Sequence, residues 1–174
     1  MPKRRYIYVL AAATAAVLGA AAAAQVGAAT SPQASDRFAR YSNVRFQYAI
    51  CYPKDLLVPQ GESANSDGQE FLSSDGGAEL IVYGTNNALN ETLKGRMSQT
   101  EARLAGARGK VTYKVQRVNW FALSGQNEQT IFYVKTLLSH GQFKSFELTY
   151  DKSKAALFDP LVGRFVSCFS DLAR

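Results

Sequence analysis

The sequence predicts an α+β domain in which an antiparallel β-sheet of about six to seven strands is flanked by helices. Three observations support this fold class. Much of the chain after residue 43 alternates apolar and polar residues with a period of two, as half-buried strands do. Two stretches, 88–105 and 159–172, instead repeat apolar residues at helical spacing. Several of the strands are separated by short turns with glycine, which is typical of hairpins.

The first 24 residues are typical of a secretory signal peptide. Lys3, Arg4 and Arg5 precede an uncharged run, 6–24, that consists mostly of alanine. Small residues allow cleavage after residue 24 or as late as residue 29. The alternative is that the run is kept as a membrane anchor. The expected location of the protein is therefore periplasmic or secreted.

Residues 25–36 predict a flexible lead-in, because they are rich in alanine, glycine, serine and proline without periodicity. The remaining residues, 37–174, are expected to form a single globular α+β domain. Within it, 44–51 alternates cleanly and predicts the first half-buried strand. A short apolar run, 56–58, ends at Pro59, and 60–68 predicts a polar loop.

A hairpin, a helix and further strands are expected next. Residues 70–73 and 78–83 flank the turn sequence Ser-Asp-Gly-Gly and predict the hairpin. Residues 88–105 predict the helix, with Asn87 or Asn90 as its cap. The expected apolar face of this helix consists of Leu89, Leu93, Met97, Thr100 and Leu104. Two strands, 111–116 and 120–123, are expected to follow it, and 124–127 predicts a turn.

Residues 130–150 predict the central hairpin of the sheet. Both arms are rich in β-branched and aromatic residues, and Gly141 lies between them. A three-residue loop, 139–141, would place Val134 opposite Phe146 and would collect the apolar side chains on one face. That face would comprise Phe132, Val134, Phe146, Leu148 and Tyr150. A two-residue loop would instead place Glu147 among apolar side chains, which favours the three-residue loop.

The chain is expected to end in a helix. Asp159 and Pro160 are suited to its N-cap and first position, and residues 153–158 could add a turn before it. The predicted buried stripe is Leu161, Phe165, Cys168, Phe169 and Leu172.

Cys51 and Cys168 are the only cysteines, and in an exported chain they predict one disulfide. It would tie the first predicted strand to the last helix. The alternative is a pair of free, buried thiols. The sequence has no Cys-x-x-Cys motif, which argues against a redox role.

The charges are unevenly distributed along the chain. The formal net charge is +6, from 20 basic and 14 acidic residues; without the three basic residues of the leader, 17 remain against 14, or +3. This is too mild to predict nucleic-acid binding. Between residues 55 and 92 there are seven acidic and no basic residues, whereas 94–117 contains seven basic residues and one acidic residue. The two segments either pair or are solvated, or the second forms a basic patch for an anionic partner. The basic residues are Lys94, Arg96, Arg103, Arg108, Lys110, Lys114 and Arg117.

The order of elements resembles the Mog1/PsbP-like fold, which includes periplasmic DcrB-type proteins. The residues that carry the resemblance are the strand sequence Phe46–Pro53, which runs into Cys-Tyr-Pro, and the strands of 120–150. The resemblance implies an antiparallel sheet sandwiched by helices and a non-catalytic binding or assembly role. It carries over no functional residues.

No catalytic, cofactor-binding or metal-binding residues are predicted. His140 is the only histidine and lies beside Gly141 in a turn, where a surface role is expected. Two cysteines that are expected to pair leave too few ligands for a zinc site. Glu70 and Glu79, on adjacent predicted strands, are the one pair that suits a carboxylate-dependent hydrolase, although residues beside a turn usually face solvent.

The function that these observations favour is an exported, non-catalytic binding or accessory domain for an envelope protein or a small ligand. Membrane contact would be at most peripheral, no cofactor is expected, and the oligomeric state is open. The alternatives are a small secreted carboxylate-dependent hydrolase and a secreted inhibitor or effector.

Overall fold

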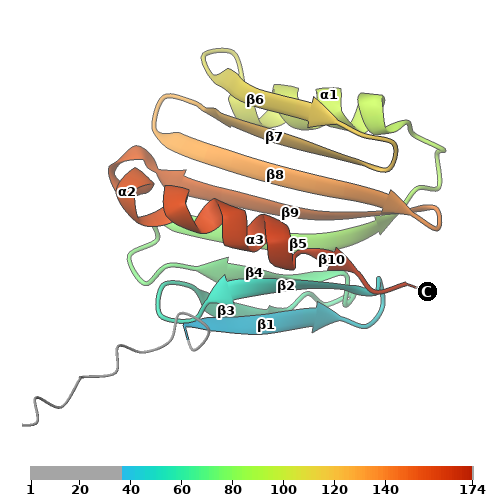
Figure 1. Cartoon of the computed structure of the whole chain (residues 1–174), viewed down its shortest axis with the longest axis horizontal. Coiled ribbons are helices and arrows are strands. Elements are labelled where there is room, and N and C mark those ends of the chain that lie inside the picture. Colours follow the sequence, from blue (N-terminus) through green and yellow to red (C-terminus); the bar gives the residue numbers. More distant parts are fainter. Residues whose placement is uncertain (1–36, 174) are drawn as a thin grey trace, which may run out of the picture. The chain divides into compact units, whose positions relative to one another are not determined.

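The computed structural model describes residues 37–173, and its central feature is a seven-stranded antiparallel sheet (Figure 1). The strands lie in the order β3-β4-β5-β9-β8-β7-β6. Their bounds are β3 Val58–Glu62, β4 Gly68–Leu72, β5 Ala78–Asn86, β6 Lys110–Gln116, β7 Trp120–Gln126, β8 Thr130–Ser139 and β9 Gln142–Asp151. The predicted α+β class, with a sheet of six to seven strands flanked by helices, is confirmed.

The predicted signal peptide, 1–24, and the predicted lead-in, 25–36, lie outside the described residues. Within residues 37–173, none of the helices combines the length and the apolar character needed to cross a membrane.

One face of the main sheet, the front face, packs against a second layer. This layer is a three-stranded sheet of order β1-β2-β10 together with the C-terminal helices. The bounds are β1 Phe38–Asn43, β2 Tyr48–Pro53, η1 Lys152–Lys154, α2 Ala155–Phe158, η2 Asp159–Leu161, α3 Val162–Cys168 and β10 Ser170–Asp171. The larger core fills the space between the layers. It includes Tyr48 and Ile50 from β2, Leu80 from β5, Phe146 from β9 and Phe165 from α3.

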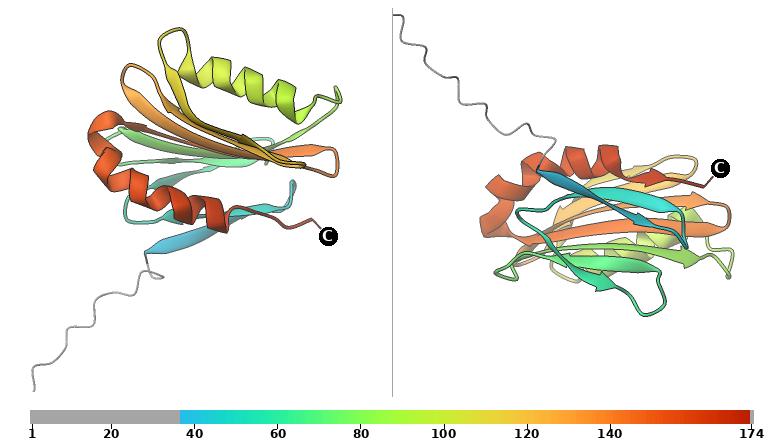
Figure 2. Two further views of the ribbon diagram at one scale, coloured as in Figure 1. Left: turned by 45° about the horizontal axis from the view of Figure 1, so that its top comes forward. Right: turned by 90° about the horizontal axis from the view of Figure 1, so that it is seen from below.

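The opposite face, the back face, is covered by helix α1, Leu93–Ala105, which packs on β6 and β7. The smaller core between them consists of Leu93, Met97, Phe121, Leu123, Val134 and Phe143. Figure 2 shows α1 and the C-terminal helices on opposite sides of the sheet.

The two covers are displaced from each other along the sheet. The front layer lies mainly over β4, β5 and β9, whereas α1 lies over β6 and β7. Among the described residues, the front of β6–β8 and the back of β3–β5 therefore stay partly open. Tyr113 on β6 is 50% exposed, and Val58 on β3 is 52% exposed.

Strand β9 holds both covers by ion pairs. On its front face, the fully buried Lys144 pairs with Asp171 of β10. On its back face, the buried Glu147 pairs with Arg103 of α1 and accepts a hydrogen bond from the Tyr83 hydroxyl at 2.7 Å. The side chains of neighbouring strand positions point to opposite faces, so one strand can bind both layers.

The predicted three-residue loop of the central hairpin is wrong. Ser139 pairs with Gln142, and the loop is His140-Gly141, with φ of 50° and 69°. Two successive residues at positive φ are typical of a type I′ turn, whose twist suits a hairpin. Val134 therefore lies opposite Glu147, and Phe132 opposite Thr149.

The predicted apolar face of that hairpin is consequently divided between the two faces of the sheet. Phe146, Leu148 and Tyr150 belong to the larger core, whereas Val134 belongs to the smaller one. The register is tolerated because both faces are covered and because Glu147 has partners on α1 and β5.

The predicted strand 44–51 is wrong in its first half. Residues 44–47 form the turn between β1 and β2, and Val44 is 89% exposed. The Asn43 side chain accepts a hydrogen bond from the Phe46 backbone N–H at 2.7 Å, and Gln47 has a φ of 52°. Asparagine commonly stabilises turns in this way, which explains why the chain reverses within an alternating pattern.

The loop predicted at 60–68 is partly wrong, because β3 extends through Pro59 to Glu62. Proline lacks the N–H that a central strand would need, but β3 is an edge strand of the sheet, where proline is tolerated. The hairpin predicted from 70–73 and 78–83 is confirmed as β4 and β5.

The first helix is shorter than predicted. It begins after Thr92, whose hydroxyl accepts a hydrogen bond from the Gly95 N–H, and not at residue 88. Leu89 is 92% exposed and does not belong to its buried face. The strands predicted at 111–116 and 120–123 are confirmed, although β7 continues to Gln126.

The C-terminal helix is interrupted and does not start at Asp159. Two 3₁₀ turns and α2 precede α3, and the Asp159 side chain accepts a hydrogen bond from Tyr150 where a helix cap was predicted. Phe165 and Phe169 are buried as predicted, whereas Leu172 lies beyond β10 and is 42% exposed.

Cys51 of β2 and Cys168 of α3 form a disulfide with a Cα–Cα distance of 5.6 Å. The bond joins two cysteines that are 117 positions apart in the sequence. Replacing both cysteines with alanine is expected to lower the free energy of unfolding by about 2–5 kcal/mol, because the unfolded chain regains loop entropy. Urea unfolding without reductant measures this difference.

Dithiothreitol provides the matched control. It should destabilise the wild type by a similar amount and leave the double variant unchanged. An oxidised wild type no more stable than the variant would contradict a stabilising disulfide.

Candidate functional site

The open front of β6–β8 forms a groove beside the C-terminal helices. Its volume is about 490 Å³. Its lining includes Tyr113 from β6, Ser124 from β7, Ile131 and Tyr133 from β8, and Tyr150 from β9, with Asp159 and Val162 on the helical side. Strand register places three of these side chains side by side at the base of the groove, because Tyr113 lies opposite Ser124, and Ser124 lies opposite Tyr133.

The tyrosines of the groove are held in place by aromatic neighbours. Tyr133 stacks on Phe146, with ring centroids 5.8 Å apart, and Tyr150 stacks on Phe158 at 5.3 Å. Burial raises the pKa of Tyr133 to about 12, and the nearby Tyr113 adds to the increase. Like any tyrosine at physiological pH, Tyr133 is neutral and offers a ring face together with one hydroxyl.

Polar groups lie near the aromatic floor. The Tyr150 hydroxyl donates a hydrogen bond to Asp159 on the helical side. Farther along β7 and β8, the Lys135 ammonium lies 5.4 Å from the Trp120 ring centroid and donates a long bond, 3.4 Å, to the Val166 carbonyl. Burial lowers the pKa of Lys135. This arrangement suits a flat apolar or aromatic ligand with polar groups at its edge.

A second arrangement, the carboxyl pair of Glu70 and Glu79, lies on the open back face. Glu70 lies opposite Ile81, and Glu79 opposite Leu72, so the two glutamates are diagonal neighbours on β4 and β5. Their carboxyl groups are close enough to share a hydrogen bond. This bond, burial and the charge of Glu70 raise the pKa of Glu79 to about 7.

The carboxyl pair has one property of a catalytic acid, namely the raised pKa, but its geometry does not suit a glycosidase. Glycosidases hold their two carboxyl groups roughly 5 to 9 Å apart to admit the reacting atoms. Glu70 and Glu79 are instead diagonal neighbours on adjacent strands, and a hydrogen bond between their carboxyl groups raises the pKa of Glu79. Glu70 lines a hollow of about 250 Å³ and Glu79 another of about 110 Å³, and the two hollows share no residue.

The seven basic residues predicted as a possible patch are spread over α1, the following loop, β6 and the turn after β6. Four of them form ion pairs, which are Arg96–Glu91, Arg103–Glu147, Arg108–Glu128 and Lys114–Glu101. Only the first pair joins the acidic segment 55–92 to the basic segment. Arg117 lies 6.0 Å from the Trp120 ring centroid. A basic patch for an anionic partner stays a prediction.

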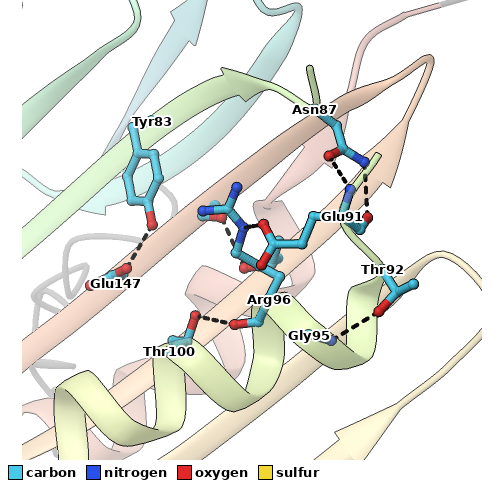
Figure 3. Close-up of polar contacts among 10 residues, drawn as sticks. Tyr83, Asn87, Glu91, Thr92, Gly95, Arg96, Thr100 and Glu147 are labelled. Carbon is cyan, nitrogen blue, oxygen red and sulfur yellow. Dashed lines mark hydrogen bonds and ion pairs between the residues drawn. The ribbon is translucent and has the colours of Figure 1, made fainter. Parts of the chain in front are cut away.

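The N-terminal end of α1 is fixed by a polar network (Figure 3). The Asn87 amide donates to the Glu91 carbonyl at 2.9 Å and accepts from the Glu91 N–H at 2.7 Å. The Arg96 guanidinium lies 4.5 Å from the Phe143 ring centroid and pairs with Glu91. These contacts hold α1 on the sheet and leave Arg96 engaged within the fold.

Residues 37–173 contain no grouping of three or more histidine, cysteine or acidic side chains suited to a metal ion. His140 is exposed in the turn between β8 and β9. The groove tyrosines were not predicted as site residues. Alternation identified their strands, but no sequence signal shows which part of a sheet face is left open by its cover.

The carboxyl pair predicts a pH-dependent stability. The pKa of Glu79 is about 7 in the folded state, whereas an unperturbed glutamate has a pKa of 4.5. The folded state therefore binds this proton more tightly than the unfolded chain does. The associated stability is fully present below about pH 4.5 and is lost as the pH rises through 7. Glu79→Gln should therefore match the wild type at pH 4.5 and exceed it by about 1 kcal/mol at pH 8, a value reduced for solvent screening. Urea unfolding at both pH values measures this.

The matched control is Glu128→Gln, which removes an exposed carboxylate that is paired with Arg108. This variant should gain no stability at pH 8. If Glu79→Gln is no more stable than the wild type at pH 8, the two carboxyl groups do not share a proton.

Comparisons with protein families and with curated protein sequences give no match. Comparison with solved structures gives a match to the cyanobacterial PsbP protein CyanoP from Synechocystis sp. PCC 6803, determined in solution. Its TM-score is 0.58 at 16% sequence identity, and the match covers 88% of this chain and 98% of that one. An identity this low is informative about the fold alone. The described chain has a PsbP-like α+β fold, as the resemblance noted from the sequence implied.

Proposed function

We propose that the protein is an exported, non-catalytic binding domain whose groove on β6–β8 holds a flat apolar or aromatic ligand. The groove itself is the observation that carries the proposal. It has about 490 Å³ of space, which is within the range of small-molecule sites, and tyrosines from three strands line it. The ligand is either a small molecule or an aromatic side chain of an envelope protein.

The chemistry of the lining favours binding over catalysis. Burial raises the pKa of Tyr133 to about 12, so its phenol is a poorer general base than an ordinary tyrosine. The Asp159 carboxylate already accepts the Tyr150 hydroxyl. Ile131 and Val162 add apolar side chains, and Thr112, Ser124 and Gln126 add neutral polar ones. The PsbP-like fold, for which a non-catalytic accessory role is the expectation, supports the same interpretation.

Export is supported by two independent features. The disulfide between Cys51 and Cys168 suits an oxidising compartment. The sequence of residues 1–24, with its basic start and alanine-rich run, is typical of a signal peptide. The proposed location is periplasmic or secreted.

Occupying the groove with an arginine side chain tests the proposal. The substitution Val162→Arg places a long charged side chain at the groove, and Val118→Arg is the matched control, because Val118 is 98% exposed and does not line the groove. Native mass spectrometry of the exported protein, purified without reductant, should show an additional stoichiometric mass in the wild type and in Val118→Arg. The additional mass should be absent from Val162→Arg.

A wild type without additional mass is titrated with indole and followed by amide NMR shifts. Saturable shifts at Ser124 and Gly125 that Val162→Arg abolishes would support an aromatic side chain of a protein as the natural ligand. Neither an additional mass nor saturable shifts in the groove would contradict the proposal.

A further inference from the structure

We propose that the open back face of β3–β5 binds an amphipathic helix of a partner protein, one that carries a lysine or arginine within its apolar face. The surface, called here the carboxylate face, consists of Val58, Glu70, Leu72, Glu79, Ile81 and Tyr83. The inference does not rest on the groove, which lies on the other face of the sheet.

The carboxylate face is the part of the sheet that α1 leaves open. By register, Val58 lies opposite Leu72, Leu72 opposite Glu79, and Glu70 opposite Ile81, so all five side chains share one face. Val58 is 52% exposed, and the other four are partly exposed. Side chains at the alternate positions of β4 and β5 point to the front face and are buried in the larger core. A sheet face with three accessible aliphatic side chains is suited to packing against a further layer.

The charges on this face are not matched within the described structure. Seven acidic residues form ion pairs, but neither Glu70 nor Glu79 does so with any residue of 37–173. The chain has more basic than acidic residues, so the lack of a cation here does not follow from composition. Two contacting carboxyl groups repel each other when both are ionised, and a cation between them would remove that repulsion.

Helix α1 packs on the same face of the sheet and is an example of the kind of helix that this face can bind. It packs Leu93 and Met97 against the sheet and directs Arg103 to the Glu147 carboxylate of β9. Figure 3 shows the Tyr83 hydroxyl directed at the same carboxylate from β5. A partner helix beside α1 would repeat this arrangement, with its aliphatic residues on Leu72 and Ile81 and its cation at the carboxyl pair.

Binding of such a helix should depend on pH. The charged groups near Glu79 are Glu70 from β4 and, from β9, Glu147, which is paired with Arg103 of α1, and Asp151, which lines the same hollow. Lys154 lies beside the neighbouring Gly77 and is paired with Asp75. An incoming cation favours the ionised form of Glu79, so it displaces the shared proton. Affinity for the partner should therefore be higher at pH 8 than at pH 6.

The test uses two synthetic amphipathic helices that differ at one position within their leucine face, where one carries lysine and the other glutamate. Fluorescence anisotropy measures their binding to the disulfide-intact protein. We expect the lysine peptide to bind more tightly than the glutamate peptide, and to bind more tightly at pH 8 than at pH 6. The double substitution Glu70→Gln and Glu79→Gln should weaken it about tenfold.

The control variant is Glu128→Gln, which removes an exposed carboxylate outside the carboxylate face. It should leave the affinity for the lysine peptide unchanged. Equal binding of the two peptides, or an equal loss in Glu128→Gln, would overturn the proposal, because binding would then follow hydrophobicity or overall charge alone.

Two further outcomes would assign the surface to another occupant and would also overturn the proposal. The first is a dimer in sedimentation that the double substitution converts to monomer, since the face would then bind a second copy of the chain. The second is displacement of the lysine peptide by millimolar Ca²⁺ or Mg²⁺ alone, which would indicate a metal-ion site.

Discussion

Burial of strand β9 on both of its faces is the constraint on which the rest of the structure depends. Residues 143–148 are buried without interruption, so a layer is required on each side of the strand. Phe146 and Leu148 require the small sheet and α3 on the front face, and Phe143 requires α1 on the back face. A strand that is buried on both faces cannot show simple alternation, because apolar residues are needed at both sets of positions.

The polar residues of β9 fix where the two layers attach. Lys144 and Glu147 would each be costly to bury alone, and each has a partner from a different layer, Asp171 of β10 and Arg103 of α1. The Asp171 carboxyl is partly buried, which would raise its pKa, but the bond from Lys144 lowers that pKa overall. Removing Asp171 or Arg103 would leave the buried Lys144 or Glu147 without its ionic partner, which is destabilising.

The displacement of the two layers explains why the protein has two open surfaces with different chemistry. The front layer leaves β6–β8 open, where tyrosine rings line a groove. Helix α1 leaves β3–β5 open, where aliphatic side chains surround the carboxyl pair. One surface is hollow and aromatic and suits a small or flat group, whereas the other suits a second helix. Among residues 37–173, the sheet therefore leaves one open surface on each of its faces without interrupting the core.

The class of fold, most strands and the main part of the first helix could be predicted from local periodicity, and two cysteines in an exported chain favoured the pairing of Cys51 with Cys168. Tertiary structure alone decided the register of the central hairpin. Glu147 can lie opposite Val134 because Arg103 and Tyr83 bind its carboxylate, and these residues lie 44 and 64 positions away in the chain. The turn at Val44 and the open positions of Tyr113 and Tyr133 were likewise undetermined. Which residues a neighbouring layer covers depends on packing between distant segments, and periodicity carries no information about it.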